Sequence, residues 1–229
     1  MIYFTENDSS KVQYSGGFFL NSQYFVTCRH SLYRHGDFND KTKIDSIIVY
    51  YNFREIQGDE KYSYSKIKVD IHYKYQNGQY SFTKNKWDGD QISDFIVLKL
   101  EKNTNISKPK FDYTAPKEKD NIYSVGFIDV NGLREIDAQS FFLYADDNAY
   151  FMLGKMDVGF SGSPIYNDKG YIIGIVTDGI RTGDDWESFK PNFKEKRLIP
   201  IINKAYESGY RVAIALNAKY FSDKLNGFQ

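Results

Sequence analysis

The chain has 229 residues, and its 30 lysines and arginines balance its 30 aspartates and glutamates. A chain of this length can bury a sizeable core, and all-β chains of this size commonly form one domain. Zero net charge, with basic residues scattered along the sequence, argues against a nucleic-acid-binding protein and against a polybasic membrane patch. No apolar run approaches the ~20 residues that a membrane-spanning helix requires. The first eight residues hold neither a basic nor a long apolar region, so we expect no secretory signal peptide.

Short apolar or alternating runs, punctuated by Gly, Asn and Asp, predict an all-β fold. In the first half, the predicted strands cover residues 12–20, 24–28, 46–53, 67–75 and 95–100. The segment 101–117 holds two of the five prolines and few apolar residues, which is typical of a linker between two units. In the second half, the predicted strands cover residues 121–127, 134–144, 150–155, 164–166, 171–178 and 211–216. Residues 200–208 and 217–225 are predicted to be helical.

The most informative stretch is Gly-Phe-Ser-Gly-Ser-Pro at residues 159–164, which places a serine hydroxyl on a glycine turn. Gly162 follows Ser161 and Gly159 precedes it by two residues, so the backbone can fold sharply and expose the hydroxyl. Such a turn can also aim backbone N–H groups at a developing oxyanion, which contributes strongly to acyl-transfer catalysis. A serine is a weak nucleophile near neutral pH and needs a base, which in turn needs an orienting carboxylate.

Candidates for both partners lie upstream. His30 follows the apolar run 25–28, and Asp94 precedes the apolar run 95–98. The chain order is therefore His30, Asp94, Ser161, whereas α/β-hydrolases run serine, acid, histidine and subtilisins run acid, histidine, serine. Only the order found in chymotrypsin-type enzymes agrees with this sequence.

The segments SGGFFLNSQYFVTCRHSL, DFIVLKL and GFSGSP together resemble those of the trypsin-like serine proteases, and among them the bacterial HtrA and glutamyl-endopeptidase branch. The resemblance implies an all-β, chymotrypsin-like double barrel of two six-stranded antiparallel β-barrels with a C-terminal helix. It implies one protease domain over residues 1–229, with barrels at 11–100 and 118–216, a helix at 217–229 and the active site in the cleft between the barrels. It also implies a serine endopeptidase that acts on protein or peptide substrates and needs no cofactor or metal.

Within this resemblance, His30 is the general base, Asp94 orients it, and Ser161 attacks the peptide carbonyl. The backbone N–H groups of Gly159 and Ser161 are expected to form the oxyanion hole. Phe160 stands where the trypsin pattern Gly-Asp-Ser-Gly-Gly-Pro carries an aspartate, so the loop must be ordered without the usual ion pair to a freed N-terminal amine. Ser163 replaces the second glycine of that pattern.

The specificity pocket is less determined. Lys155 lies six residues before Ser161, where trypsin-type enzymes carry the residue at the base of the S1 pocket, and a lysine there would favour an acidic or polar P1 side chain. The pocket wall is expected at Thr177, Asp178 and Gly179. Asp178, Asp184 and Asp185 favour a basic P1 side chain instead, and Lys155 at a strand end could simply face solvent, so the P1 preference stays open.

Each triad candidate also has an ordinary structural explanation. His30 could fill a turn, Ser161 could be a residue of a glycine turn, and Asp94 could flank a strand, with Asp88 and Asp90 as rival carboxylates. His35 and His72 are expected at the surface.

Cys28 is the only cysteine, so no intramolecular disulfide can form. We interpret Cys28 as a small core residue and expect a cytoplasmic bacterial protein. An active protease is the favoured hypothesis, and a catalytically silent binding or scaffold module is the alternative. Control by a regulatory partner, or by fused sensor domains, would be compatible with the first.

Overall fold

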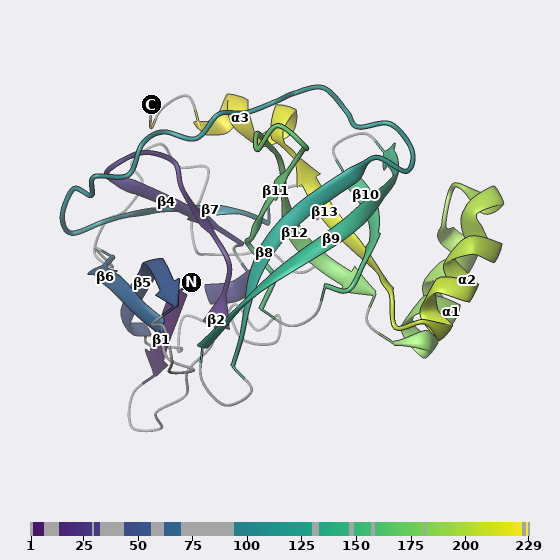
Figure 1. The fold of residues 1–229 in the computed structure, drawn as a ribbon, viewed down its shortest axis with the longest axis horizontal. Coiled ribbons are helices and arrows are strands. Elements are labelled where there is room, and N and C mark those ends of the chain that lie inside the picture. Colours follow the sequence, from purple (N-terminus) through teal and green to yellow (C-terminus); the bar gives the residue numbers. More distant parts are fainter. Residues whose placement is uncertain are drawn as a thin grey trace.

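The computed structural model describes residues 2–6, 14–28, 30–32, 44–55, 62–69, 94–129, 133–146, 149–156, 159–180, 182–225 and 228. The fold is mostly β, and its second half is a closed antiparallel barrel with the strand order β10-β13-β12-β11-β8-β9 (Figure 1). These strands are β8 (Asn121–Asp129), β9 (Leu133–Asp146), β10 (Ala149–Gly154), β11 (Pro164–Tyr166), β12 (Ile172–Ile180) and β13 (Arg211–Asn217). All six strands of this half were predicted, and the expected six-stranded barrel is confirmed here.

The first half forms two sheets among the described residues, not the closed six-stranded barrel that was expected. One has the order β2-β1-β5-β6 and the other the order β3-β4-β7. The strands are β1 (Ile2–Glu6), β2 (Tyr14–Ser15), β3 (Phe18–Phe19), β4 (Tyr24–Thr27), β5 (Ile44–Glu55), β6 (Tyr62–Lys68) and β7 (Ile96–Lys99). One buried core joins both sheets, because Phe25 and Leu98 pack with Val49 and Ile67.

Two strand predictions in this half need correction. The predicted strand 12–20 is interrupted at Gly16 and Gly17, where a Cβ on Gly17 would lie only 2.2 Å from the Phe25 ring. The predicted strand 67–75 begins earlier, as β6, and ends at Lys68 with an isolated bridge from Val69 to Leu100; residues 70–75, with His72, lie outside the described residues, as do His35, Asp88 and Asp90. Strand β1 was not predicted.

The two halves share a second core, which holds the molecule together across its middle. Phe18 and Phe95 from the first half pack with Ile175 and Leu216 of the barrel and with Phe221 of the C-terminal helix α3 (Ala218–Leu225). The segment 101–120 connects β7 to β8 and runs past α3, as Figure 1 shows in teal along the top. Helix α3 lies within the predicted C-terminal helix 217–229, and the role of residues 101–117 as a linker between two barrels stays a prediction.

A helical insertion lies between β12 and β13 and projects from one end of the barrel (Figure 1). It contains α1 (Gly183–Phe189), the short turns η4 (Lys190–Asn192) and η5 (Lys196–Leu198), and α2 (Ile199–Glu207). Helix α2 was predicted, whereas α1 was not. Helix α1 begins at a capping box in which the Thr182 hydroxyl accepts the Asp185 N–H and the Asp185 carboxylate accepts the Thr182 N–H. Trp186 and Phe193 bury the insertion against Phe151 of the barrel.

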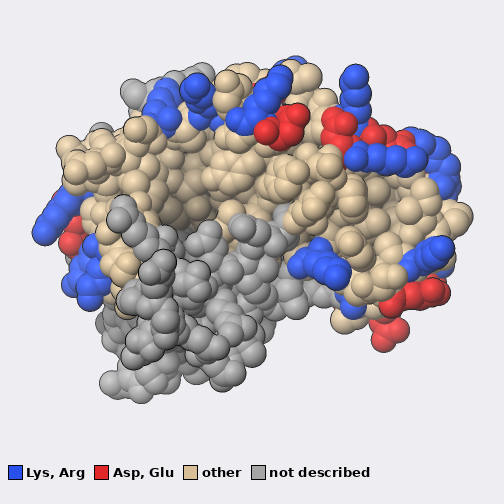
Figure 2. Space-filling model, in the orientation of Figure 1, with Lys and Arg blue, Asp and Glu red and all other residues tan. Residues whose placement is uncertain are grey.

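The described surface carries both signs of charge. Lysines and arginines alternate with acidic residues along the upper edge and around the helical insertion in Figure 2. Within the described ranges, no helix combines the length and the apolar character that a membrane crossing needs.

Candidate active site

The antiparallel pairing of β4 with β7 brings His30 and Asp94 together. Thr27 at the end of β4 pairs with Ile96 at the start of β7, so residues just after Thr27 and just before Ile96 lie at the same end of this sheet. His30 opens the short turn η1 (His30–Leu32) directly beyond β4. The sequence thus needs only one strand pairing to place a base beside a carboxylate that is 64 residues away.

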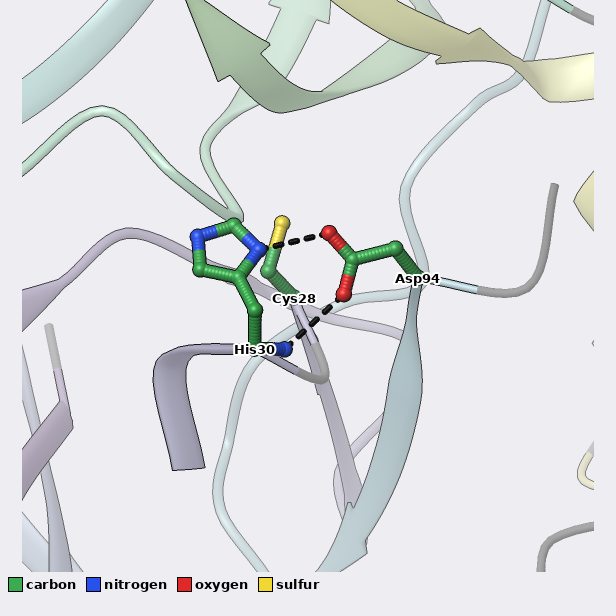
Figure 3. Close-up of side chains that lie close together, drawn as sticks. All are labelled: Cys28, His30 and Asp94. Atoms are coloured by element: carbon green, nitrogen blue, oxygen red, sulfur yellow. Dashed lines mark hydrogen bonds and ion pairs between the residues drawn. The ribbon is translucent and has the colours of Figure 1, made fainter. Parts of the chain in front are cut away.

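Asp94 fixes both the backbone and the ring of His30. Its Oδ1 accepts the His30 backbone N–H at 2.8 Å, and its Oδ2 lies 2.5 Å from the imidazole Nδ1 (Figure 3). Because carboxylate oxygens accept hydrogen bonds, this contact assigns the proton to Nδ1 and leaves Nε2 as the basic nitrogen. In Figure 3 the ring edge with Nε2 faces away from Asp94. The His30 and Asp94 side chains are 31% and 19% exposed, so the pair is reachable from solvent.

Cys28 lies beside this pair but its thiol is held in the neutral form. The Sγ donates to the Val176 carbonyl at 2.9 Å and is fully buried. Burial, and secondarily the nearby charge of Asp94, raise the pKa of the Cys28 thiol well above its ordinary value. The thiol is therefore a poor nucleophile, in agreement with its interpretation as a small core residue.

The same three residues are the one metal-compatible group in the described ranges. Each residue offers one ligand atom, and the three atoms, from Cys28, His30 and Asp94, lie within 4.8 Å of one another. A metal ion there would need the thiolate, which burial disfavours, and would have to displace the proton between Nδ1 and Asp94. The hydrogen bonds of this group fit a base and its orienting acid better than a metal centre.

Ser161 occupies the first central position of a type II-like turn. The Ser163 N–H donates to the Phe160 carbonyl at 2.8 Å, and Gly162 follows Ser161 with φ +84°, a conformation that favours glycine. Gly159 also has a positive φ, of +101°. In the described part of the chain, neither the Gly159 nor the Ser161 backbone N–H donates to a protein acceptor.

This turn packs directly on the end of β4. A Cβ on Gly162 would lie 2.4 Å from Thr27 Oγ1 and 2.9 Å from the Cys28 nitrogen, so only glycine allows this approach. The Gly16 N–H donates to the Ser161 carbonyl at 2.8 Å across the boundary between the two halves. The residue after Ser161 therefore touches the strand end that leads, two residues later, into His30.

Phe160 anchors the turn in the barrel. Its side chain is 1% exposed and packs in the barrel core with Ile122, Met156 and Ile165. Gly126 makes room for the ring, because a Cβ there would lie 2.6–2.7 Å from three Phe160 ring carbons. A buried aromatic ring thus stands where the trypsin pattern has a charged side chain, which answers how this loop is ordered.

The predicted pocket residues lie in different environments. Lys155 is exposed at the end of β10, with its ammonium 5.4 Å from the centre of the Tyr210 ring. Thr177 is buried at an irregularity of β12 and donates to the Ile214 carbonyl, and the half-buried Asp178 accepts the Gly179 N–H at 2.7 Å. Asp184 is exposed in the first turn of α1, where it and Asp185 complement the helix dipole.

Three buried hydroxyl groups lie near the turn that were not predicted from the sequence. Ser15, Thr27 and Ser31 are at most 1% exposed, and hydrogen bonds connect them to one another or to the Ser161 turn. Ser15 was visible only as the polar residue before paired glycines, and Ser31 as the residue after the candidate base. Neither position has a local pattern that signals a role.

Comparisons with known proteins agree with this geometry. Residues 15–175, more than half of the chain, match the family described as "Trypsin-like peptidase domain". A search of curated proteins finds no significant match. Among solved structures, the chain is similar to the active form of the Rv3671c protease from M. tuberculosis, at 15% identity and a TM-score of 0.54, covering 98% of this chain and 77% of that one. It is also similar to a Glu endopeptidase in complex with MPD, at 13% identity and a TM-score of 0.56, covering 96% of this chain and 86% of that one. The matched family model covers more than half of the chain, and the structure has a closed barrel and a histidine–aspartate pair beside a glycine turn. This chain therefore belongs to the trypsin-like peptidase domain family.

Proposed function

We propose that the protein is a serine endopeptidase whose triad is His30, Asp94 and Ser161. The observation that carries the proposal is the pair of hydrogen bonds that Asp94 accepts from the backbone N–H and Nδ1 of His30, at the strand end on which the Ser161 turn packs. A carboxylate that fixes both ring orientation and tautomer is what a histidine base requires.

In the proposed reaction, Ser161 Oγ attacks the peptide carbonyl while His30 Nε2 takes its proton. Asp94 stabilises the imidazolium that results. His30 then gives the proton to the leaving amine, and water hydrolyses the acyl-enzyme by the same route. The backbone N–H groups of Gly159 and Ser161, which donate to no acceptor among the described residues, would stabilise the oxyanion, because they are fixed dipoles that need no reorganisation during the reaction.

The limits of the catalytic domain and a cytoplasmic location are also part of this proposal. We propose a single catalytic domain over residues 1–229, with its N-terminal unit at 11–100 and its C-terminal barrel at 118–216. The single buried Cys28 is compatible with a reducing cytoplasm. Control by a partner protein or by fused sensor domains stays part of this proposal.

A fluorophosphonate probe tests the proposal without knowledge of the substrate. We expect stoichiometric labelling at Ser161 that disappears in Ser161→Ala and falls by at least about 10³-fold in rate in His30→Ala. Ser140→Ala is the control serine substitution outside the proposed triad, because the buried Ser140 hydroxyl has no hydrogen-bond partner among the described residues. Folded wild-type protein that stays unlabelled would favour the silent scaffold. Labelling at a residue other than Ser161 would refute this triad.

For substrate preference, we propose an acidic P1 residue recognised by Lys155. Asp184 and Asp185 lie in the first turn of α1, where they stabilise the start of the helix. They therefore no longer count as evidence for a basic P1 side chain. The face of the Tyr210 ring supports the Lys155 ammonium and leaves its N–H donors available. Cleavage of a peptide library should show glutamate or aspartate at P1, and Lys155→Met should abolish that preference. Unchanged P1 selectivity in Lys155→Met would show that Lys155 faces solvent only.

A further inference from the structure

The carbonyl oxygen of Ser161 is held by two donors from the other half of the molecule. The Gly16 backbone N–H lies 2.8 Å away, and the Ser15 hydroxyl lies 2.5 Å away. Ser15 is 1% exposed, so its hydroxyl has no access to bulk water. A buried side-chain donor aimed at the backbone of a nucleophile is not explained by the triad.

Counting protons fixes the direction of the hydrogen bonds around Ser15. A serine hydroxyl has one proton, and its two carbonyl neighbours are Ser161 at 2.5 Å and Gly16 at 3.4 Å, so Ser15 donates to the nearer carbonyl of Ser161. Ser31 Oγ lies 2.6 Å from Ser15 Oγ and must then be the donor to Ser15. Thr27 uses its own proton on the Gly16 carbonyl at 2.7 Å. The result is a directed relay from Ser31 through Ser15 to the Ser161 carbonyl, in which each bond polarises the next.

The relay restrains the peptide plane on the C-terminal side of Ser161. In a trans peptide the C=O and N–H point in opposite directions. The Ser161 carbonyl points toward Ser15 and Gly16, and the N–H of the same peptide unit, on Gly162, donates to Val176 of β12 at 2.7 Å. This one peptide unit therefore connects the first half of the molecule to the barrel. Any rotation of it would break hydrogen bonds on both sides.

The relay also starts beside the base. Ser31 is the residue after His30 on the turn η1, and it is as deeply buried as Ser15. Its hydroxyl thus connects the backbone that carries His30 to the backbone that carries Ser161. The two catalytic side chains are set relative to one another through a path that does not involve the imidazole itself.

We propose that Ser15 is a positioning residue, which holds the Ser161 backbone through its carbonyl while Ser31 orients the Ser15 hydroxyl. This inference rests on the proposed function of Ser161. It names two residues that touch neither substrate nor the reacting atoms but set the distance between base and nucleophile. Misplacement on the scale of an ångström is enough to slow a reaction substantially.

The test compares Ser15→Ala, Ser15→Cys and Ser31→Ala with the matched control Ser140→Ala. Active sites are counted by fluorophosphonate titration, and kcat and KM are measured on a library-derived peptide well below each variant's Tm. We expect Ser15→Ala to lower kcat about 10-fold with KM changed less than about twofold. Ser31→Ala should lower kcat about threefold, because Ser15 loses the hydrogen bond that orients it but keeps its own proton for the Ser161 carbonyl. Ser15→Cys should be intermediate, because a thiol donates weakly.

Affinity for a peptide boronic acid, which mimics the tetrahedral intermediate, separates positioning from folding. A positioning role predicts that Ser15→Ala weakens boronate binding by about the same factor as kcat, with the pH profile unchanged. A merely structural role predicts a lower Tm with normal kcat per titrated site, and that result would overturn the inference. A wild-type protein that is not labelled at Ser161 would refute the proposed function instead, so the two failures are distinguishable.

Discussion

Gly126→Ala offers a sharp test of how the Ser161 turn is held, because it acts on the turn through a single contact. The new Cβ would lie 2.6–2.7 Å from three carbons of the Phe160 ring, whereas ordinary contacts begin near 3.4 Å. The ring must therefore retreat by about 0.8 Å. Phe160 is 1% exposed in a packed core, so the ring cannot move into solvent and its backbone must follow.

The expected consequences have different sizes for stability and for catalysis. Overpacking of this kind costs about 1–3 kcal/mol of unfolding free energy, which corresponds to a Tm decrease of several degrees for a chain of this size. Because Phe160 is bonded to Ser161, the shift also displaces the nucleophile and its N–H group. A displacement near 1 Å is expected to lower the acylation rate about 10- to 100-fold.

The assay is the second-order rate constant of fluorophosphonate labelling, measured beside the Tm. Gly183→Ala is the control: it makes the same substitution where nothing lies within 4 Å, and it should leave labelling unchanged. Combining Gly126→Ala with Phe160→Leu should restore part of the rate relative to Gly126→Ala alone, because the smaller side chain relieves the overlap. A Gly126→Ala protein that is destabilised but labels at the wild-type rate would refute the coupling between Phe160 and the turn.

Four further predictions concern Asp94 of the proposed triad and the buried side chains of Cys28 and Tyr150. Asp94→Asn should lower the labelling rate at neutral pH by roughly 10³–10⁴-fold with the Tm nearly unchanged, since an amide no longer selects the required His30 tautomer; a loss below tenfold would contradict the assignment of Asp94. The Cys28 thiol should resist iodoacetamide in the native protein at pH 8 and react after unfolding in urea, which mass spectrometry can follow. The pKa of Cys28 is raised in the folded state, so the folded protein keeps a proton that the unfolded chain releases above about pH 9. The contribution of Cys28 to stability is therefore complete below that pH and is lost as the pH rises further. In urea unfolding between pH 7 and 10, the free energy of unfolding should decline less for Cys28→Ala than for wild type. Tyr150, with a pKa raised by burial to about 12, should add a similar loss above pH 10 that Tyr150→Phe removes.

The sequence by itself was sufficient for features that depend on short-range chemistry. Alternating strands are visible from side-chain periodicity, and the glycine turn around Ser161 is visible because only glycine tolerates a positive φ at Gly162. The pairing of His30 with Asp94 was predicted from chain order and resemblance. In the structure, the antiparallel pairing of β4 with β7 brings the two residues together.

Features that depend on residues far apart in the chain required the tertiary structure. Helix α1 was missed because its capping box lies in an acidic segment with little apolar periodicity, while burial of Trp186 against the barrel stabilises it. The sequence showed that the Ser161 turn lacks the charged side chain of the trypsin pattern, and only the structure shows that Phe160 packs on Gly126 at this position instead. The hydroxyl of Ser15 and the carbonyl of Ser161 are 146 residues apart, and no local pattern connects them. Local chemistry thus determined which side chains can react, and long-range packing decided how rigidly they are held. The reason is that hydrogen bonds and steric fit between distant segments exist only once the two halves of the molecule have packed together.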